Sequence, residues 1–146
     1  MDAKAGALLA ELTSGNGSRV WAATGTVVRE AGPETLRALA PYLSSIRRAT
    51  AGLDLGGQLL DNDLHLRQAL RVIAAAGDGL CPCAVYEGYP GYDPRQEQTR
   101  GHVEILHTTP PDWNMTYWCR CRHCARTYEV EQGEYHTTWW RWTRRG

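Results

Sequence analysis

The first eighty residues of this 146-residue chain contain no cysteine, although the chain has five. All five thiols lie in two short clusters, Cys81-Pro82-Cys83 and Cys119-Arg120-Cys121-Arg122-His123-Cys124. An odd number of cysteines cannot form a closed disulfide framework, and clustered cysteines in a reducing compartment more often bind metal. This distribution therefore predicts a metal site in the second half of the chain.

The chain also lacks an excess of charge of either sign. Sixteen basic residues balance sixteen acidic ones, and residues 1–80 and 81–146 each contain eight of both kinds. A typical DNA-binding domain has a strongly basic surface, because much of its affinity comes from phosphate contacts. The charge balance therefore excludes a basic domain of that kind. Fractions of 42% hydrophobic and 22% charged residues are ordinary for a globular protein.

Long apolar runs are absent as well. No stretch approaches the roughly 20 apolar residues that span a bilayer, and Met1-Asp2-Ala3-Lys4 does not begin a charged-then-apolar signal pattern. We therefore expect a cytoplasmic protein with no membrane partner. The length suits one domain or two small subdomains. We expect the boundary between residues 1–79 and 80–146, and nothing in the sequence predicts the oligomeric state.

Catalytic motifs are missing too. The chain has no Gly-rich phosphate loop, nucleophile elbow or paired-carboxylate motif. His102-Val103-Glu104 followed by Cys121-x-x-Cys124 resembles the signature of zinc deaminases. However, Arg120 stands where that family has proline, the histidine begins a strand pattern rather than a helix, and Cys81-Pro82-Cys83 is left unexplained. We therefore expect no enzymatic activity.

The first part of the chain has the apolar spacing of amphipathic helices. We expect helices over residues 3–12, 19–30 and 33–50, and a fourth helix that ends at residue 76. Asp2 is suited to cap the first helix, and Asp61 or Asn62 to cap the fourth. Pro41 interrupts the third pattern, so that helix should kink or split there.

One stretch of this region has a distinctive order of helices and turns. In GALLAELTSGNGSRVWAATGTVVREAGPETLRALAPYL a leucine-rich helix, a polar turn, a Val- and Ala-rich helix and a Gly-Pro-Glu step follow one another. This order resembles the HEAT-type helical repeat, over about two units in residues 3–76. The resemblance implies a helical layer that binds protein, and a generic four-helix packing unit is the alternative. Because a solenoid needs about three units to stand alone, we expect the C-terminal part to pack on this layer.

Beyond residue 80 the chain becomes rich in aromatic residues and alternating patterns. Six of its seven tyrosines and five of its six tryptophans lie there. We expect strands over residues 102–107, 115–121, 126–131 and 134–142. The Gln132-Gly133 junction predicts a two-residue hairpin with Val130 opposite Tyr135 and Glu129 opposite His136. The predicted fold is therefore α+β, with the helical layer packed on a small antiparallel sheet.

Two cysteine clusters on separate turns can supply the four ligands of a tetrahedral zinc site. Cys121-x-x-Cys124 followed by Tyr128 resembles the knuckle of zinc ribbons, which implies two thiolates aimed at one ion and backbone N–H groups facing the sulfurs. Ala125 stands where that family prefers glycine. Cys119 lies on the same strand face as Cys121 and is an alternative ligand; five unligated thiols are the other alternative. The expected zinc ligands are Cys81, Cys83, Cys121 and Cys124.

Two segments are candidates for partner binding. The loop of residues 84–100 contains three tyrosines, whose rigid amphipathic side chains contribute contact area at little entropic cost. The last strand contains neighbouring tryptophans, and exposed aromatic area commonly marks a contact surface. The alternative for both segments is ordinary packing in the core. The candidate residues are Tyr86, Tyr89, Tyr92, Trp139, Trp140 and Arg141.

The expected function is a non-enzymatic, zinc-stabilised adaptor module that binds another protein, and an immunity- or regulator-type role fits a chain of this size. The alternative is nucleic-acid binding, because tryptophans beside arginines form stacking platforms that hold single strands. A third hypothesis is a redox sensor using Cys119, which requires an exposed thiol of lowered pKa. The protein-binding and nucleic-acid-binding hypotheses can be distinguished by the arginines of this region. Nucleic-acid binding requires them to lie together on one face, whereas pairing with Glu129, Glu131 and Glu134 would argue against it. The arginines concerned are Arg120, Arg122, Arg126, Arg141, Arg144 and Arg145.

Overall fold

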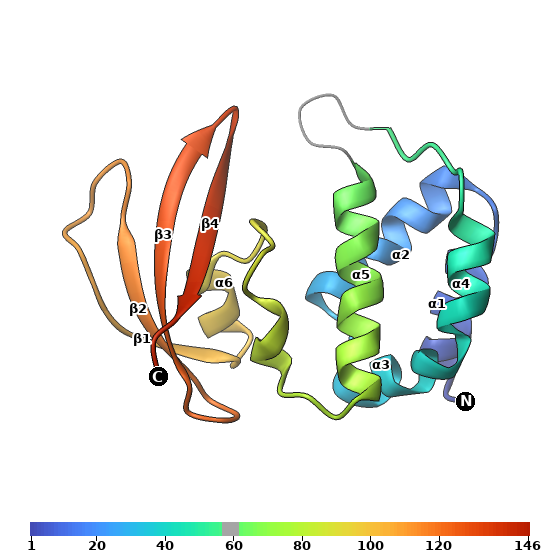
Figure 1. Cartoon of the computed structure of the whole chain (residues 1–146), viewed down its shortest axis with the longest axis horizontal. Helices are drawn as coiled ribbons and strands as arrows, with labels where there is room; N and C mark the ends of the chain where they lie inside the picture. Colours follow the sequence, from blue (N-terminus) through green and yellow to red (C-terminus); the bar gives the residue numbers. More distant parts are fainter. Residues whose placement is uncertain (57–61) are drawn as a thin grey trace. The chain divides into compact units, whose positions relative to one another are not determined.

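The computed structural model describes residues 1–56 and 62–146. Its contacts divide the chain into two compact units, Met1–Leu80 and Cys81–Gly146. The first unit is helical and the second contains a four-stranded antiparallel sheet, which confirms the predicted α+β class (Figure 1). Within the described residues, no helix combines the length and the apolar character needed to cross a membrane.

The helical unit contains α1 (Ala3–Leu12), α2 (Gly17–Arg29), α3 (Pro33–Leu39), the 3-10 turn η1 (Ala40–Tyr42), α4 (Leu43–Thr50) and α5 (Asn62–Gly77). The carboxylate of Asp2 accepts a hydrogen bond of 2.7 Å from the backbone N–H of Ala5, so the predicted cap of α1 is confirmed. Asn62 is the first residue of α5, and the other predicted cap, Asp61, lies outside the described residues.

Pro41 splits the third predicted helix. The helix α3 ends at Leu39, Pro41 lies in η1, and α4 begins at Leu43. Proline has no N–H to continue the helical ladder, and its ring clashes with the preceding turn. Apolar residues from both sides of the split nevertheless enter one core with α1, α2 and α5. Its most deeply buried members include Leu12, Val20, Val27, Leu39, Ile46, Ala69 and Ile73.

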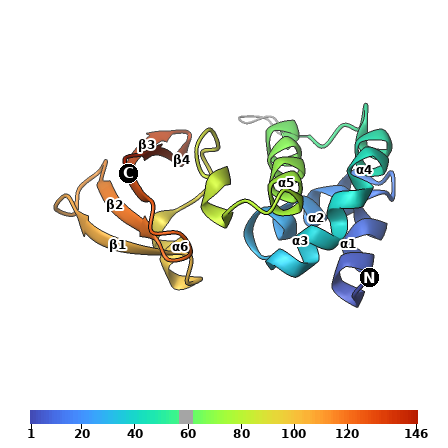
Figure 2. The same ribbon diagram turned by 60° about the horizontal axis from the view of Figure 1, so that its bottom comes forward.

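The second unit contains η2 (Pro82–Val85), α6 (Pro94–Thr99), β1 (Val103–Thr108), β2 (Thr116–Cys121), β3 (Thr127–Tyr135) and β4 (Thr137–Arg144). The strands lie in the sheet in chain order, β1-β2-β3-β4, and each pair is antiparallel (Figure 2). Both edge strands donate a hydrogen bond to the segment that precedes the sheet. The N–H of Ile105 in β1 bonds to Gln98 in α6 at 2.7 Å, and that of Trp140 in β4 bonds to the carbonyl of Pro90 at 3.0 Å.

One face of this sheet is covered by the segment between the two cysteine clusters. The ring of Tyr86 stacks on Trp142 with centroids 4.2 Å apart, and the indole N–H of Trp142 donates to the carbonyl of Tyr92 at 2.9 Å. Tyr86, Tyr89 and Tyr92 are only 2%, 2% and 3% exposed. The prediction that these three tyrosines bind a partner is therefore wrong: they form the aromatic core of the unit.

The β3–β4 hairpin turns at His136 rather than at the predicted Gln132-Gly133 junction. Val130 pairs with Trp142, Glu129 pairs with Thr143, and the chain reverses at His136, which has a φ of 61°. The predicted pairings of Val130 with Tyr135 and of Glu129 with His136 are therefore wrong. Gly133 is a strand residue opposite Trp139, whose indole lies where a Cβ of residue 133 would project. A glycine inside a strand often marks such a close approach, and a cross-strand aromatic ring then covers it.

This contact predicts a large effect from one methyl group. A Cβ at position 133 would lie within 2.7 Å of three indole atoms of Trp139, namely Cζ2, Cε2 and Cη2. Gly133→Ala should therefore lower the free energy of unfolding by about 1–3 kcal/mol. In a Trp139→Ala background the same substitution should cost close to nothing, because the clash is gone. Urea denaturation followed by far-UV circular dichroism measures both differences. Equal losses in the two backgrounds would show that the indole is not the cause.

Candidate metal centre

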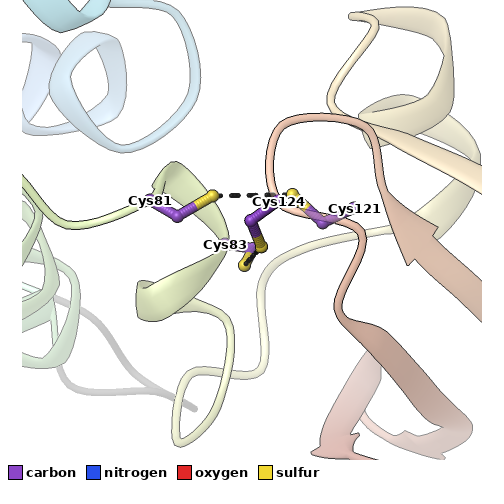
Figure 3. A group of neighbouring side chains, drawn as sticks. All are labelled: Cys81, Cys83, Cys121 and Cys124. Carbon is purple, nitrogen blue, oxygen red and sulfur yellow. Dashed lines mark hydrogen bonds between the residues drawn. The ribbon is translucent and has the colours of Figure 1, made fainter. Parts of the chain in front are cut away.

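The two cysteine clusters meet beside the turn that joins β2 to β3. Cys81 precedes η2 and Cys83 lies in it, whereas Cys121 ends β2 and Cys124 lies in the following turn. Their four Sγ atoms all lie within 4.8 Å of one another, and Figure 3 shows the side chains pointing toward a common centre. The structure therefore brings together the four cysteines that the sequence pairs as ligands.

The separations of the sulfur atoms suit a single tetrahedral ion. The Sγ atoms of Cys81 and Cys121 are 3.6 Å apart, and those of Cys83 and Cys124 are 3.5 Å apart. Bonds of about 2.3 Å from zinc to four thiolates place neighbouring sulfurs about 3.8 Å apart. A disulfide requires about 2.05 Å. The cluster could therefore hold one metal ion, and four sulfur ligands would leave no open position for water.

The first pair of sulfurs is positioned by the proline between them. Cys81 has an extended backbone with a ψ of 142°, and Pro82 begins the 3-10 turn η2. The N–H of Ala84 donates to the carbonyl of Cys81 at 2.9 Å, and that of Tyr86 donates to the carbonyl of Cys83 at 3.2 Å. Because proline fixes φ near the value that this turn requires, both thiols face the same side of a short turn.

The second pair lies in a tight turn closed by main-chain bonds. The N–H of Ala125 donates to the carbonyl of Cys121 at 2.9 Å, and the N–H of Cys121 donates to the carbonyl of Arg126 at 2.8 Å. The N–H of His123 points at the sulfur of Cys121, 3.3 Å away. Ala125 has a φ of 65°, a left-handed conformation that is unfavourable for any residue with a Cβ. This turn explains the preference for glycine that the zinc-knuckle resemblance implies.

The thiols of the cluster differ in acidity because burial and hydrogen bonds affect them to different extents. Burial raises the pKa of Cys81 to about 11, and it also raises the pKa of Cys83, although the hydroxyl of Tyr128 donates to that sulfur at 3.2 Å. For the exposed Cys124, desolvation acts in the same direction, but hydrogen bonds from the Arg126 backbone and the neighbouring thiols lower the pKa to about 7. Four close sulfurs cannot all be ionised unless a cation neutralises them.

Cys119 lies outside the cluster. It is fully buried between its strand neighbours, Ile105 and Tyr128, and this burial raises the pKa of its thiol to about 12. The structure therefore contradicts its role as an alternative ligand. It also contradicts the redox-sensor hypothesis, which requires an exposed thiol of lowered pKa.

The two histidines near the cluster do not join it either. His102 precedes the strand β1 rather than a helix and is not one of the clustered residues, so the resemblance to zinc deaminases fails on structure as well. His123 is exposed, as expected for a residue inside the turn.

The remaining predicted partner residues lie on β4. Trp139 covers Gly133, and Trp140 donates its indole N–H to the side chain of Gln132 at 3.2 Å, so both rings are half-buried by contacts within the sheet. Arg141 is exposed and forms an ion pair with Glu131. Of the six predicted partner residues, Arg141 is thus the one whose side chain is largely exposed.

Sequence reasoning missed the centre of the exposed sheet face, which we call the open face. Its ring stack joins His107 and Trp118, with centroids 4.2 Å apart and planes 15° apart. The strand alternation of β2 could have identified this face. Tyr117, Cys119 and Cys121 point to the buried side of the sheet, so Trp118 must point to the opposite side. The open face is formed by Glu104, His107, Trp118, Arg120, Glu129, Glu131, Trp139 and Arg141.

Three of the six arginines considered above pair with glutamates. Besides the pair of Arg141 and Glu131, Arg120 bonds to Glu104 at 3.2 Å, and Arg145 bonds to Glu129 at 3.1 Å. Glu134, the third acid considered, accepts a hydrogen bond from the hydroxyl of Thr138 instead. Opposite charges therefore alternate across the open face rather than forming a basic patch.

Comparisons with known proteins identify no family for the chain. No protein-family model, curated protein or solved structure matches it. The resemblances to HEAT-type repeats and to zinc ribbons therefore stay predictions. The structure itself establishes a helical unit and a four-stranded antiparallel sheet with a four-cysteine cluster.

The left-handed residue of the cysteine turn predicts a stabilising substitution. An alanine in this conformation costs roughly 1–2 kcal/mol, and the extra chain entropy of glycine costs about 0.5–1 kcal/mol. Ala125 is exposed, so Ala125→Gly should raise the free energy of unfolding by about 0.5–1 kcal/mol. Ala125→Val is the matched control and should lower it, because branching at Cβ worsens the same strain. Chemical denaturation measures both changes, and a stability loss in the glycine variant would contradict this explanation.

Proposed function

We propose that the four-cysteine cluster binds one zinc ion, and that this ion stabilises a non-enzymatic module whose open face binds another protein. Thiolate ligands in a tetrahedral arrangement select zinc or iron–sulfur centres. Sulfur separations of 3.5 and 3.6 Å favour a single ion. A site closed by four thiolates has a structural role, because it has no position for substrate or water.

The size of the second unit supports a stabilising role for the ion. The unit spans Cys81–Gly146, and cores of fewer than about 70–80 residues commonly need a metal or disulfides in addition to hydrophobic burial. The ion would join η2 to the β2–β3 turn, two segments about 40 residues apart in the chain. Closing so long a loop removes much of the conformational freedom of the unfolded chain.

The single observation that favours a protein over a nucleic acid is the pairing of Arg120 and Arg141 with glutamates on the open face. A phosphate backbone would have to displace the carboxylates of Glu104 and Glu131 from their arginines, and the surface offers no net positive charge to compensate. An aromatic centre of Trp118 and His107 flanked by paired charges suits a protein interface, in which aromatic residues and arginine are enriched. The helical unit, if it acts as the HEAT-type resemblance implies, would add a second protein-binding surface. An immunity- or regulator-type role is compatible with such a module.

The zinc proposal predicts opposite metal contents for two cysteine variants. Wild-type protein should contain about one zinc ion per chain by elemental analysis. Cys124→Ser should lose this zinc and much of the thermal stability of the sheet unit. Cys119→Ala should lose some stability, because it opens a cavity in the core, but should keep its zinc.

Two results would contradict this assignment. Full zinc content and an unchanged melting temperature in Cys124→Ser would show that the ligands are wrong. Iron in place of zinc in protein purified from a native source would show that the metal is wrong.

The partner proposal is tested by exchanging the charges of one ion pair. Glu131→Arg combined with Arg141→Glu keeps the net charge and the possibility of pairing, but it reverses the charge pattern that a partner meets. Tagged wild-type protein purified from a nuclease-treated native lysate should retain a protein partner, and the exchanged variant should lose it. Glu11→Arg with Arg19→Glu is the matched control, because that pair is also exposed but lies in the helical unit.

Other outcomes of this purification point elsewhere. A 260/280 nm absorbance ratio that is high without nuclease treatment and falls after it would favour the nucleic-acid alternative. A partner that binds the exchanged variant as well as wild type would exclude the open face as its binding site.

A further inference from the structure

Two imidazole rings lie side by side next to the cysteine turn. The Nδ1 atom of His102 and the Nε2 atom of His123 are 3.1 Å apart, and the ring planes are inclined by 51°. His123 is exposed and His102 is half-buried. Neither ring belongs to the four-cysteine cluster, so this pair is not explained by the site already described.

The pair is held in place by the main chain. The N–H of Arg122 donates to the carbonyl of His102 at 2.9 Å, and the next residue, Val103, pairs with Cys121 in the sheet. The N–H of His123 is in turn directed at the sulfur of Cys121, 3.3 Å away. Both histidines are therefore attached to backbone that the sheet and the turn keep ordered, although they lie 21 positions apart in the chain.

The distance between the two nitrogens suits chelation of one ion. Metal–nitrogen bonds of about 2.0–2.1 Å place two imidazole nitrogens about 2.9 Å apart at a right angle and about 3.3 Å apart at the tetrahedral angle. The observed 3.1 Å lies between these values. We propose that His102 and His123 form a second metal site, separate from the cysteine cluster, for a borderline divalent transition-metal ion.

The ligand set determines which ions fit. Neutral imidazole binds zinc, copper and nickel well, whereas magnesium and calcium prefer oxygen ligands. Among the described residues, no third histidine, cysteine or carboxylate joins the pair. Water or a group from another molecule must therefore complete the coordination, so this ion should bind more weakly and exchange faster than one held by four thiolates.

A hydrogen bond between two neutral imidazoles explains the same nitrogen–nitrogen distance without any metal. The two explanations differ in whether the protein takes up a metal ion at this pair.

Full-length protein carrying a tag without histidine is first loaded with zinc, and nickel(II) is then added at neutral pH. Isothermal titration calorimetry should show about one nickel ion bound per chain, with no release of zinc. His102→Gln and His123→Gln should each abolish this binding while keeping the zinc content of wild type. His107→Gln, which alters an exposed histidine elsewhere on the sheet, is the matched control and should bind nickel as wild type does.

Three results would overturn the second site. These are no nickel uptake by wild-type protein, uptake that survives both glutamine substitutions at the pair, and uptake accompanied by an equal release of zinc. The last would mean that nickel replaces zinc at the thiolates. The outcome is independent of the zinc proposal, because nickel binding is followed at the histidines and zinc content is measured separately in every variant.

Discussion

The convergence of four sulfur atoms is the constraint on which the second unit depends. Cys81 and Cys83 belong to the segment that covers the sheet, whereas Cys121 and Cys124 belong to the sheet's central turn. Where no ion joins the sulfurs, hydrophobic packing and a few hydrogen bonds must hold this covering segment against the strands. The stacking of Tyr86 on Trp142 and the hydrogen bond of Tyr128 to Cys83 continue the contact away from the cluster. The aromatic core and the cysteine cluster thus stabilise the same arrangement.

The features that sequence predicted correctly are those set by neighbours in the chain. Asp2 caps α1 because its side chain reaches an N–H three residues away, and Pro41 ends α3 because it cannot continue a helix. The four cysteines could be grouped because a short spacing constrains each pair. Strand alternation could not set Cys119 apart from them, because Cys119 lies on the same face of β2 as Cys121.

The features that sequence predicted wrongly depend on contacts between distant residues. Gly133 looked like a turn residue, and only the indole of Trp139 above it explains why the strand continues. The tyrosines between the cysteine clusters looked like an exposed loop, because Gly and Pro separate them and no local pattern shows that Trp142 lies beneath. Likewise, nothing in the local sequence shows that Arg141 finds Glu131 across the hairpin.

The hydrogen bonds at the two edges of the sheet have a consequence for how the protein behaves at high concentration. An uncovered edge strand is a template for strands of other molecules, and natural proteins block such edges. Gln98 and Pro90 each occupy one backbone donor at an edge, and both belong to the segment that the first two cysteines anchor. Loosening that anchor would release the blocking groups together with the segment. Damage to the cysteine cluster would then favour self-association through β1 and β4.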